Sequence, residues 1–298
     1  MKTRTKVVLL AAFVMFDMAI GLGVWRHVNQ EPPSSELRVS SESASPSAAK
    51  NDSVAGSTQQ KFSFKPAESY SISMANDDTV VRALRGSCDG GDPGELAVST
   101  DGGASSDTAD TGLREILAVQ ATSRTELRVV GADASCTVTR LTSTDGGDTW
   151  LADFAEPLWY PGLSNDQNVV TPEGARDAGC TVTSLSQVGS SFGRVTCSDG
   201  TIRGTGDSGD KWVTLGRLDN VRVATFATFN TGYALAVFQG CAAQEMTTRD
   251  GGRTWAKGGC ITGDRAQAVD ANDTGLVAVV DEEFYVSNNG GKEWSQPK

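Results

Sequence analysis

The sequence predicts an all-β protein, a β-propeller of four-stranded antiparallel blades preceded by one transmembrane helix. Two observations lead to this prediction. An eight-residue turn pattern recurs five times at blade-sized intervals, and an apolar N-terminal run follows a cluster of basic residues. The composition agrees, because 33 glycines and only 38% hydrophobic residues in a chain of 298 suit a protein with many tight turns.

The repeated octet reads Ser or Thr, any residue, Asp, any residue, Gly, two further residues and Trp. Its copies lie at 99–106, 143–150, 205–212, 248–255 and 287–294, with starts 44, 62, 43 and 39 residues apart. The first copy lacks the tryptophan, and the last has Asn in place of Asp. The pattern is typical of a hairpin turn, in which Asp accepts backbone hydrogen bonds, Gly adopts a positive φ and Trp packs between sheets.

We assign the repeated Asp, Asn and Trp positions of the octets to turns and core, and to neither metal binding nor catalysis. These positions are Asp101, Asp145, Trp150, Asp207, Trp212, Asp250, Trp255, Asn289 and Trp294. Each aspartate closes its own turn and is separated from the next by about one blade, so the spacing does not predict a shared metal site.

The residues before each octet repeat as strand, short polar turn and strand, at 70–86, 118–131, 183–197, 224–240 and 267–280. With the two strands flanking the octet, each unit contains the four strands of a propeller blade. Five octets therefore predict five blades in a domain over residues 61–298. Because only four residues follow the last octet, we expect residues 61–66 to pair with the last blade and close the ring.

The octets resemble the Asp-box (BNR) repeats of a propeller family that includes sialidases, sortilin-type receptors and photosystem assembly factors. The resemblance covers roughly residues 62–298. It implies the fold and no particular chemistry, since the family shares a turn. Family members more often have six or seven blades, so a degenerate blade is the alternative to a ring of five.

The N-terminal residues predict a membrane anchor. Residues 7–25 are apolar, and at 1.5 Å per residue such a helix extends about 28 Å, the thickness of the bilayer hydrocarbon. Basic residues precede the run, which predicts a cytoplasmic stub at 1–6 and an extracytoplasmic C-terminal domain at the cell membrane. A cleaved signal peptide is the alternative. Residues 26–60, rich in Ser, Ala, Pro and charge, are predicted to be a flexible extracytoplasmic linker.

The charge distribution argues against nucleic acid as a partner. The chain carries a formal charge of −11, and the balance of +3 up to His27 leaves −14 on the remainder. A domain this acidic is repelled by phosphate backbones. His27 is also the one histidine of the chain, which excludes a domain histidine as catalytic base or zinc ligand. We predict no cofactor and no metal.

Six cysteines in an exported chain predict disulfides. They are Cys88, Cys136, Cys180, Cys197, Cys241 and Cys260. Strand parity places all six on the face opposite the octet turns, with pairs 180–197 and 241–260 inside blades and 88–136 joining two neighbouring blades.

Two groups of residues are candidates for contact with a partner. Trp159 and Tyr160 lie in an insertion of about twenty residues within 154–180, predicted to be a long loop on the cysteine-rich face. The alternative is that both aromatics pack under their own loop. Arg82, Arg128 and Arg194 occupy similar second-strand positions in successive blades, where they either line a binding surface or point to solvent.

The sequence therefore favours a non-catalytic, membrane-anchored, extracytoplasmic propeller that binds a protein or carbohydrate partner. A diverged, sialidase-like exo-glycosidase is the alternative. The resemblance implies for such an enzyme an arginine cluster, a Tyr nucleophile with a Glu partner and an Asp that acts as the acid, yet the F/Y-R-I-P segment of sialidases is absent. Tyr70, Tyr233 and Tyr285 all fall in strand-like segments, where core packing accounts for them.

Overall fold

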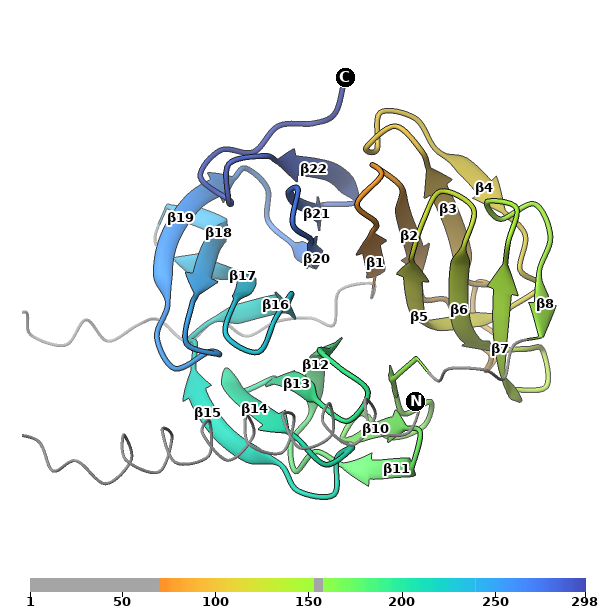
Figure 1. Cartoon of the computed structure of the whole chain (residues 1–298), viewed down its shortest axis with the longest axis horizontal. Helices are drawn as coiled ribbons and strands as arrows, with labels where there is room; N and C mark the ends of the chain where they lie inside the picture. The colour runs from red at the N-terminus through yellow and green to blue at the C-terminus, as the bar shows by residue number, and fades with distance from the viewer. Residues whose placement is uncertain (1–69, 153–157, 239) are drawn as a thin grey trace, which may run out of the picture. The chain divides into compact units, whose positions relative to one another are not determined.

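The computed structural model describes residues 70–298 except 153–157 and 239, and these residues form six antiparallel sheets arranged around a ring (Figure 1). Every regular element in this part of the chain is a strand. The predicted all-β propeller is therefore confirmed, whereas the prediction of five blades is wrong, because the ring contains six. No helix within the described ranges is long and apolar enough to cross a membrane.

The first three blades follow one another in chain order. Blade 1 consists of β1 (Tyr70–Met74), β2 (Val80–Leu84), β3 (Glu95–Ser99) and β4 (Asp107–Ala109). Blade 2 consists of β5 (Glu115–Ala121), β6 (Leu127–Ala132), β7 (Val138–Ser143) and β8 (Leu151–Ala152). Blade 3 has three described strands, β9 (Tyr160–Pro161), β10 (Asn168–Thr171) and β11 (Gly174–Asp177).

The remaining blades complete the ring. Blade 4 consists of β12 (Val182–Gln187), β13 (Gly193–Cys197), β14 (Thr201–Thr205) and β15 (Val213–Arg217). Blade 5 consists of β16 (Val221–Phe226), β17 (Gly232–Phe238), β18 (Cys241–Thr248) and β19 (Ala256–Ile261). Blade 6 consists of β20 (Ala266–Ala271), β21 (Leu276–Val280) and β22 (Glu283–Ser287).

Blade 3 is the element that the sequence did not predict. The insertion expected as a long loop forms β9, β10 and β11, and the turn between the last two replaces an octet. In that turn Thr171 Oγ1 donates to the carbonyl oxygen of Gly174 at 3.2 Å, and it also lies 3.0 Å from the carbonyl oxygen of Ser208 in blade 4. A two-residue turn thus connects these strands without the repeated motif, which is why counting octets undercounts the blades.

The innermost strands contact one another in turn around the ring, from β1 through β5, β9, β12 and β16 to β20, which returns to β1 (Figure 1). Side-chain acceptors join several of them. Ser73 Oγ accepts from the Ala121 N–H at 3.1 Å, and Asp270 Oδ2 accepts from the Met74 N–H at 2.9 Å, which joins the last blade to the first. Burial raises the pKa of Asp270 to about 6, although the Met74 N–H acts in the opposite direction.

Each octet turn is held by the same set of hydrogen bonds. In the copy of blade 2, Ser143 Oγ accepts from the Gly147 N–H at 2.8 Å, and Asp145 Oδ1 accepts from the Thr149 N–H at 2.9 Å. Hydrogen bonds from the Thr149 hydroxyl and N–H and the Ser143 hydroxyl lower the pKa of Asp145 to about 2. Equivalent bonds lower the pKa of Asp101 and Asp250 to about 2 and that of Asp207 as well.

The second glycine of each octet packs directly against the preceding blade. A Cβ on Gly252, at φ 96°, would lie 2.9 Å from Ile202 Cγ2 of blade 4, and one on Gly291 would lie 2.6 Å from Glu245 Cγ of blade 5. A larger residue at these positions would push the two blades apart. The octet therefore sets both the turn and the distance between sheets.

The cores of the propeller lie between blades. Five clusters of buried apolar side chains each join two neighbouring blades, from blades 1 and 2 round to blades 5 and 6. Trp150, Trp212, Trp255 and Trp294 each belong to the cluster between their own blade and the one before it.

The three predicted disulfides are confirmed, with Cα–Cα distances of 5.4 Å for Cys88–Cys136, 5.8 Å for Cys180–Cys197 and 5.9 Å for Cys241–Cys260. The first joins the β2–β3 loop to the β6–β7 loop and so ties blade 1 to blade 2.

The predictions for the N-terminal part, namely the stub, the anchor, the linker and a closing strand at 61–66, lie outside the described residues. At the outer edge of blade 6, Ser295 forms a bridge to Val286 of β22, with hydrogen bonds of 2.9 and 3.1 Å.

Replacing Trp212 by Ala should lower the free energy of unfolding by about 3–5 kcal/mol, because the side chain is buried in the cluster between blades 3 and 4. Val213, the next residue, points outward and is 45% exposed, so Val213→Ala should change the stability by less than about 0.5 kcal/mol. Equilibrium unfolding in urea measures both. Equal losses in the two variants would contradict the assigned packing.

Glu245 gives blade 5 a pH-dependent contribution to stability. The side chain is fully buried, Oε1 accepts from the Thr247 hydroxyl at 2.7 Å, and burial raises the pKa to about 7 against an ordinary 4.5. As the pH rises, this carboxyl ionises in the unfolded chain before it does in the folded protein. The free energy of unfolding of the wild type therefore decreases as the pH rises from 4.5 to about 7. Glu245→Gln should therefore gain roughly 2–3 kcal/mol relative to wild type between pH 4 and pH 8. Exposed Glu283→Gln is the control, and parallel pH profiles for all three proteins would refute this assignment.

Candidate binding site between blades 6 and 1

The interface between blades 6 and 1, here called the closing interface, differs from the other five. Among the described residues no apolar cluster spans it. Polar contacts cross it instead. Besides the Asp270–Met74 bond, Asn272 Nδ2 donates to the Ala75 carbonyl oxygen at 2.9 Å.

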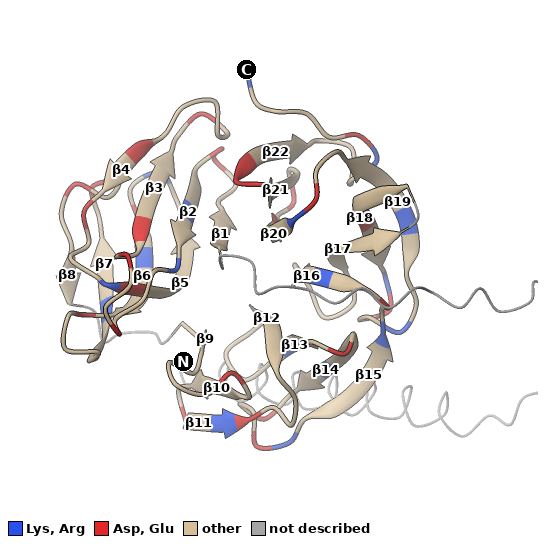
Figure 2. Ribbon diagram, turned by 180° about the vertical axis from the view of Figure 1, so that it is seen from behind, with Lys and Arg blue, Asp and Glu red and all other residues tan. Residues whose placement is uncertain are grey.

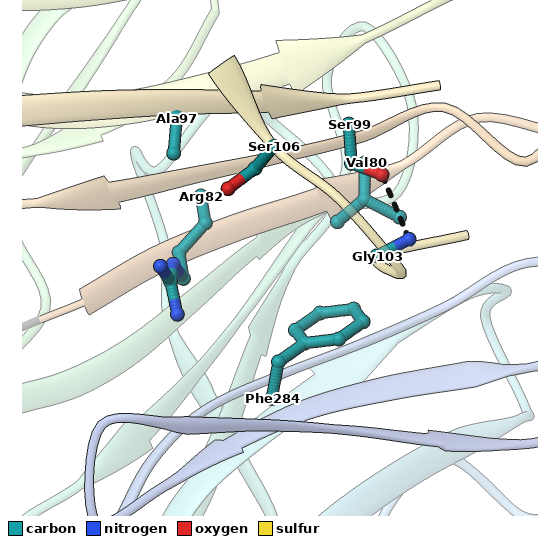
Figure 3. A pocket seen from close by; sticks show the side chains of 7 residues that line it. All are labelled: Val80, Arg82, Ala97, Ser99, Gly103, Ser106 and Phe284. Atoms are coloured by element: carbon teal, nitrogen blue, oxygen red, sulfur yellow. Dashed lines mark hydrogen bonds between the residues drawn. The ribbon is translucent and has the colours of Figure 1, made fainter. Parts of the chain in front are cut away.

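A sequence difference in the first octet explains part of this. Ser106 is the eighth residue of that octet, the position that tryptophan occupies in the other four. Those four tryptophans lie in the clusters that fill the interface with the preceding blade. At the closing interface the small, exposed serine leaves a pocket of about 50 Å³, shown in Figure 3 and here called the closing pocket.

The closing pocket has one aromatic wall, one cation and one hydroxyl. Its lining consists of Val80, Arg82, Ala97, Ser99, Gly103, Ser106 and Phe284. Arg82, Ser106 and Phe284 face the same space from three different strands or turns (Figure 3). The Ser99 hydroxyl is already engaged, since it donates to Asp101 and accepts from the Gly103 N–H at 2.8 Å.

Phe284 reaches the pocket from blade 6. It stands three residues before the octet of its own blade, the position that Ile202 has in blade 4 and Glu245 in blade 5. Its ring packs on Gly103, where a Cβ would lie 2.0 Å from Cε1. The ring therefore covers the octet turn of blade 1 and forms a flat apolar wall.

Arg82 supplies the positive charge. Its hydrogen bond among the described residues runs from Nη1 to the Glu282 carbonyl oxygen at 3.2 Å, and no ion pair with a described carboxylate neutralises it. A guanidinium has five N–H donors, so most of them remain available to a ligand. Acidic residues occur in several blades (Figure 2), whereas the lining of this pocket contains a cation and no carboxylate.

The three predicted arginines do not form one surface. The third-strand residues opposite Arg128 and Arg194 immediately precede their octets, whereas Ala97, opposite Arg82, lies one position earlier. Side chains alternate along a strand, so Arg82 leaves its blade on the other side. It contacts blade 6, while Arg194 contacts a carbonyl oxygen of blade 5 and Arg128 pairs with Glu126 of its own blade at 3.0 Å.

Trp159 and Tyr160 are core residues of blade 3 and its neighbours, which corrects the prediction of an exposed contact site. Trp159 is 2% exposed, its ring packs on Gly193, and its backbone N–H donates to Gln187 Oε1 at 3.0 Å. Tyr160 is 8% exposed and joins the cluster between blades 2 and 3. Both aromatics are used to pack a short blade, so neither offers a ring to a partner.

The structure also brings together residues that the sequence did not single out. Phe192 and Phe229, in the first hairpin turns of blades 4 and 5, form an exposed edge-to-face pair with ring centroids 4.8 Å apart. The Phe229 carbonyl oxygen accepts from Arg194 Nη2 at 3.3 Å. Burial, together with the charge of Arg253, lowers the pKa of Arg194. A second pocket of about 120 Å³, polar and exposed, lies between the octet turns of blades 1 and 2.

One group with metal-ligand atoms occurs in the described part of the chain, at Cys88, Asp89 and Cys136. Its two sulfurs are joined in a disulfide. They therefore offer no thiolate, the form of cysteine that binds metals.

Comparison with known proteins finds only remote structural neighbours for this chain. No protein-family model and no curated protein matches the chain. The structure of YCF48 bound to D1 peptide is 18% identical, covering 60% of this chain and 54% of its own, with a TM-score of 0.32. The GH74 xyloglucanase from Xanthomonas campestris is 15% identical over 78% of this chain and 38% of its own, with a TM-score of 0.33.

The six-bladed fungal lectin from Aleuria aurantia is 11% identical over 77% of this chain and 94% of its own, with a TM-score of 0.45. The chain spans about half the length of the YCF48 structure that it matches. At these identities and TM-scores the likeness assigns no ligand and no activity to this chain.

Replacing Ser106 by Trp should raise the melting temperature, because the indole then fills the closing pocket as Trp150, Trp212, Trp255 and Trp294 fill the other interfaces. Ser105→Trp is the control, since Ser105 is exposed and hydrogen-bonds Asp101, so this change should lower the melting temperature. Differential scanning calorimetry compares the two. A lower melting temperature for Ser106→Trp would show that the pocket is not the place of a missing indole.

Proposed function

We propose that the chain is a non-catalytic binding propeller, built from Asp-box repeats and held on the extracytoplasmic side of the cell membrane by residues 7–25. Its partner is a protein or a carbohydrate, which it binds at the closing pocket. The observation that carries the proposal is the contrast between interfaces: five are filled by apolar clusters, and the sixth presents an aromatic wall and a cation around an open space.

The chemistry of the closing pocket supports binding. Its lining contains a guanidinium, a hydroxyl and a phenyl ring, which are groups that orient and contact a ligand. The lining contains no carboxylate, whereas glycoside hydrolysis uses a pair of them. This difference argues for the binding function over the exo-glycosidase alternative at this site.

The cysteine chemistry supports the compartment. All six cysteines are paired, and such disulfides persist in oxidising compartments outside the cytoplasm. The proposed topology, with basic residues 2–6 inside and the propeller outside, is consistent with this chemistry.

Site-specific photocrosslinking in native membranes tests the function. A photoreactive p-benzoylphenylalanine replaces Asp107, an exposed residue that is adjacent in sequence to the pocket residue Ser106. We expect the full-length chain carrying it to give a defined crosslinked product with one partner, and Arg82→Glu in the same chain to abolish that product because the charge in the pocket is reversed.

The control places the same photoreactive residue at Val213, which is exposed on the outer strand of blade 4. It should give no such product. Equal crosslinking from both positions, or a product that persists in Arg82→Glu, would remove the closing pocket as the binding site. The absence of any product at position 107 would refute the binding function.

A further inference from the structure

The four octet tryptophans show what the walls of an interface in this propeller accept. In blades 2, 4, 5 and 6 the eighth octet residue places an indole in a cluster with the preceding blade. The closing pocket lies at the equivalent interface of blade 1, and Ser106 stands at the equivalent position. In the other four octets, an aromatic side chain therefore occupies the position that Ser106 leaves open.

The walls of the closing pocket suit an aromatic ring from another molecule. Val80 and Ala97 provide apolar surface, and Phe284 provides a ring for offset or edge-to-face contact. The guanidinium of Arg82 faces the same space (Figure 3), where it can lie over an incoming π-face.

The lining side chains offer too few hydrogen-bond acceptors for a sugar, since a guanidinium only donates. Of the lining residues, Ser99 uses its hydroxyl within the turn, which leaves the Ser106 hydroxyl and the Arg82 guanidinium as hydrogen-bonding side chains. A pyranose ring has several hydroxyl groups that lose water when it is buried, and each requires a partner. An aromatic side chain loses few hydrogen bonds to water when it is buried. Its single polar group, such as the indole N–H, can bond to the Ser106 hydroxyl.

We propose that the closing pocket binds a tryptophan or tyrosine side chain presented by a partner protein, which occupies the place of the absent octet indole. The proposal rests on the proposed function and names the chemistry of its partner. Arg82 and Phe284 hold the ring between them, and Ser106 leaves the space open.

Ligand-observed fluorine NMR tests the proposal on the full-length chain in detergent micelles. The probe is N-acetyl-5-fluorotryptophanamide, which is neutral and reports binding by line broadening. For so small a ligand we expect a dissociation constant on the order of 1 mM or below. N-acetyltyrosinamide should displace the probe, and N-acetylleucinamide should not.

Three variants separate the pocket from partition of the probe into the micelle. Ser106→Trp should weaken binding at least tenfold, because its own indole fills the site, while the melting temperature does not fall. Ser106→Ala, which keeps the space open, should bind within about twofold of wild type. Arg82→Gln should weaken binding several-fold, because the cation over the ring is lost.

Other outcomes would overturn the proposal. Equal broadening in wild type and Ser106→Trp would show that the probe binds elsewhere. Displacement by methyl glycosides but not by aromatic amides would assign the pocket to a carbohydrate. A tenfold gain in affinity on replacing Phe62 and Phe64 by Ala would identify residues 61–66 of the same chain as the occupant. In these cases a crosslinked partner at position 107 would still support the binding function, so the two hypotheses fail separately.

Discussion

The close approach of each octet turn to the preceding blade is the contact on which the assembly of this propeller depends. The second glycine of the octet lies against a side chain of the neighbouring sheet, and in four of the five octets the distance leaves no room for a Cβ. The tryptophan at the end of the same octet then fills the apolar space beside that contact. One eight-residue motif thus forms a turn, sets the spacing between two sheets and supplies part of their common core. The buried Glu245 under Gly291 is a local exception, in which a carboxyl stands where Ile202 stands one blade earlier.

The closing interface uses a different solution. Its two blades come from opposite ends of the domain, and polar contacts from Asp270, Asn272 and Arg82 join them. Phe284 packs against the first octet turn there. The result is an interface that closes the ring near its centre and leaves a pocket farther out. Both the pocket and its proposed function therefore depend on one difference between the octets, the serine at position 106.

The sequence predicted the propeller and the disulfides because both follow from local rules. Octets mark third-strand turns, and strand parity places all six cysteines on one face. The strand and blade to which each cysteine belongs then predicts the three pairs that the structure contains. Blade 3 was not predicted because its hairpin at Thr171–Gly174 is closed by a two-residue turn with no octet, and because its strands are only two to four residues long. The same misreading placed Trp159 and Tyr160 on a surface loop.

The candidate site was only half visible in the sequence. The absence of tryptophan from the first octet is a readable signal, and it points to an unfilled interface. Which residues surround the space is not readable, because Phe284 lies about 180 positions away and joins Ser106 only when the ring closes. Likewise, the apparent equivalence of Arg82 with Arg128 and Arg194 fails by a single register position, which sends its side chain to the opposite side of the sheet.

The bond between Asp270 and Met74 spans 196 residues of chain, and this separation bears on the order in which the molecule folds. Hairpins and octet turns form between residues close in sequence, so each blade can organise as soon as its own strands are available. Joining β1 to β20 requires closure of a very long loop, whose entropic cost must be met before its contacts are gained. During synthesis the face of the first blade that packs against the sixth therefore stays uncovered until the sixth blade is complete. Because Ser106 stands where other octets have an indole, this face of blade 1 exposes one large apolar side chain fewer before the ring closes.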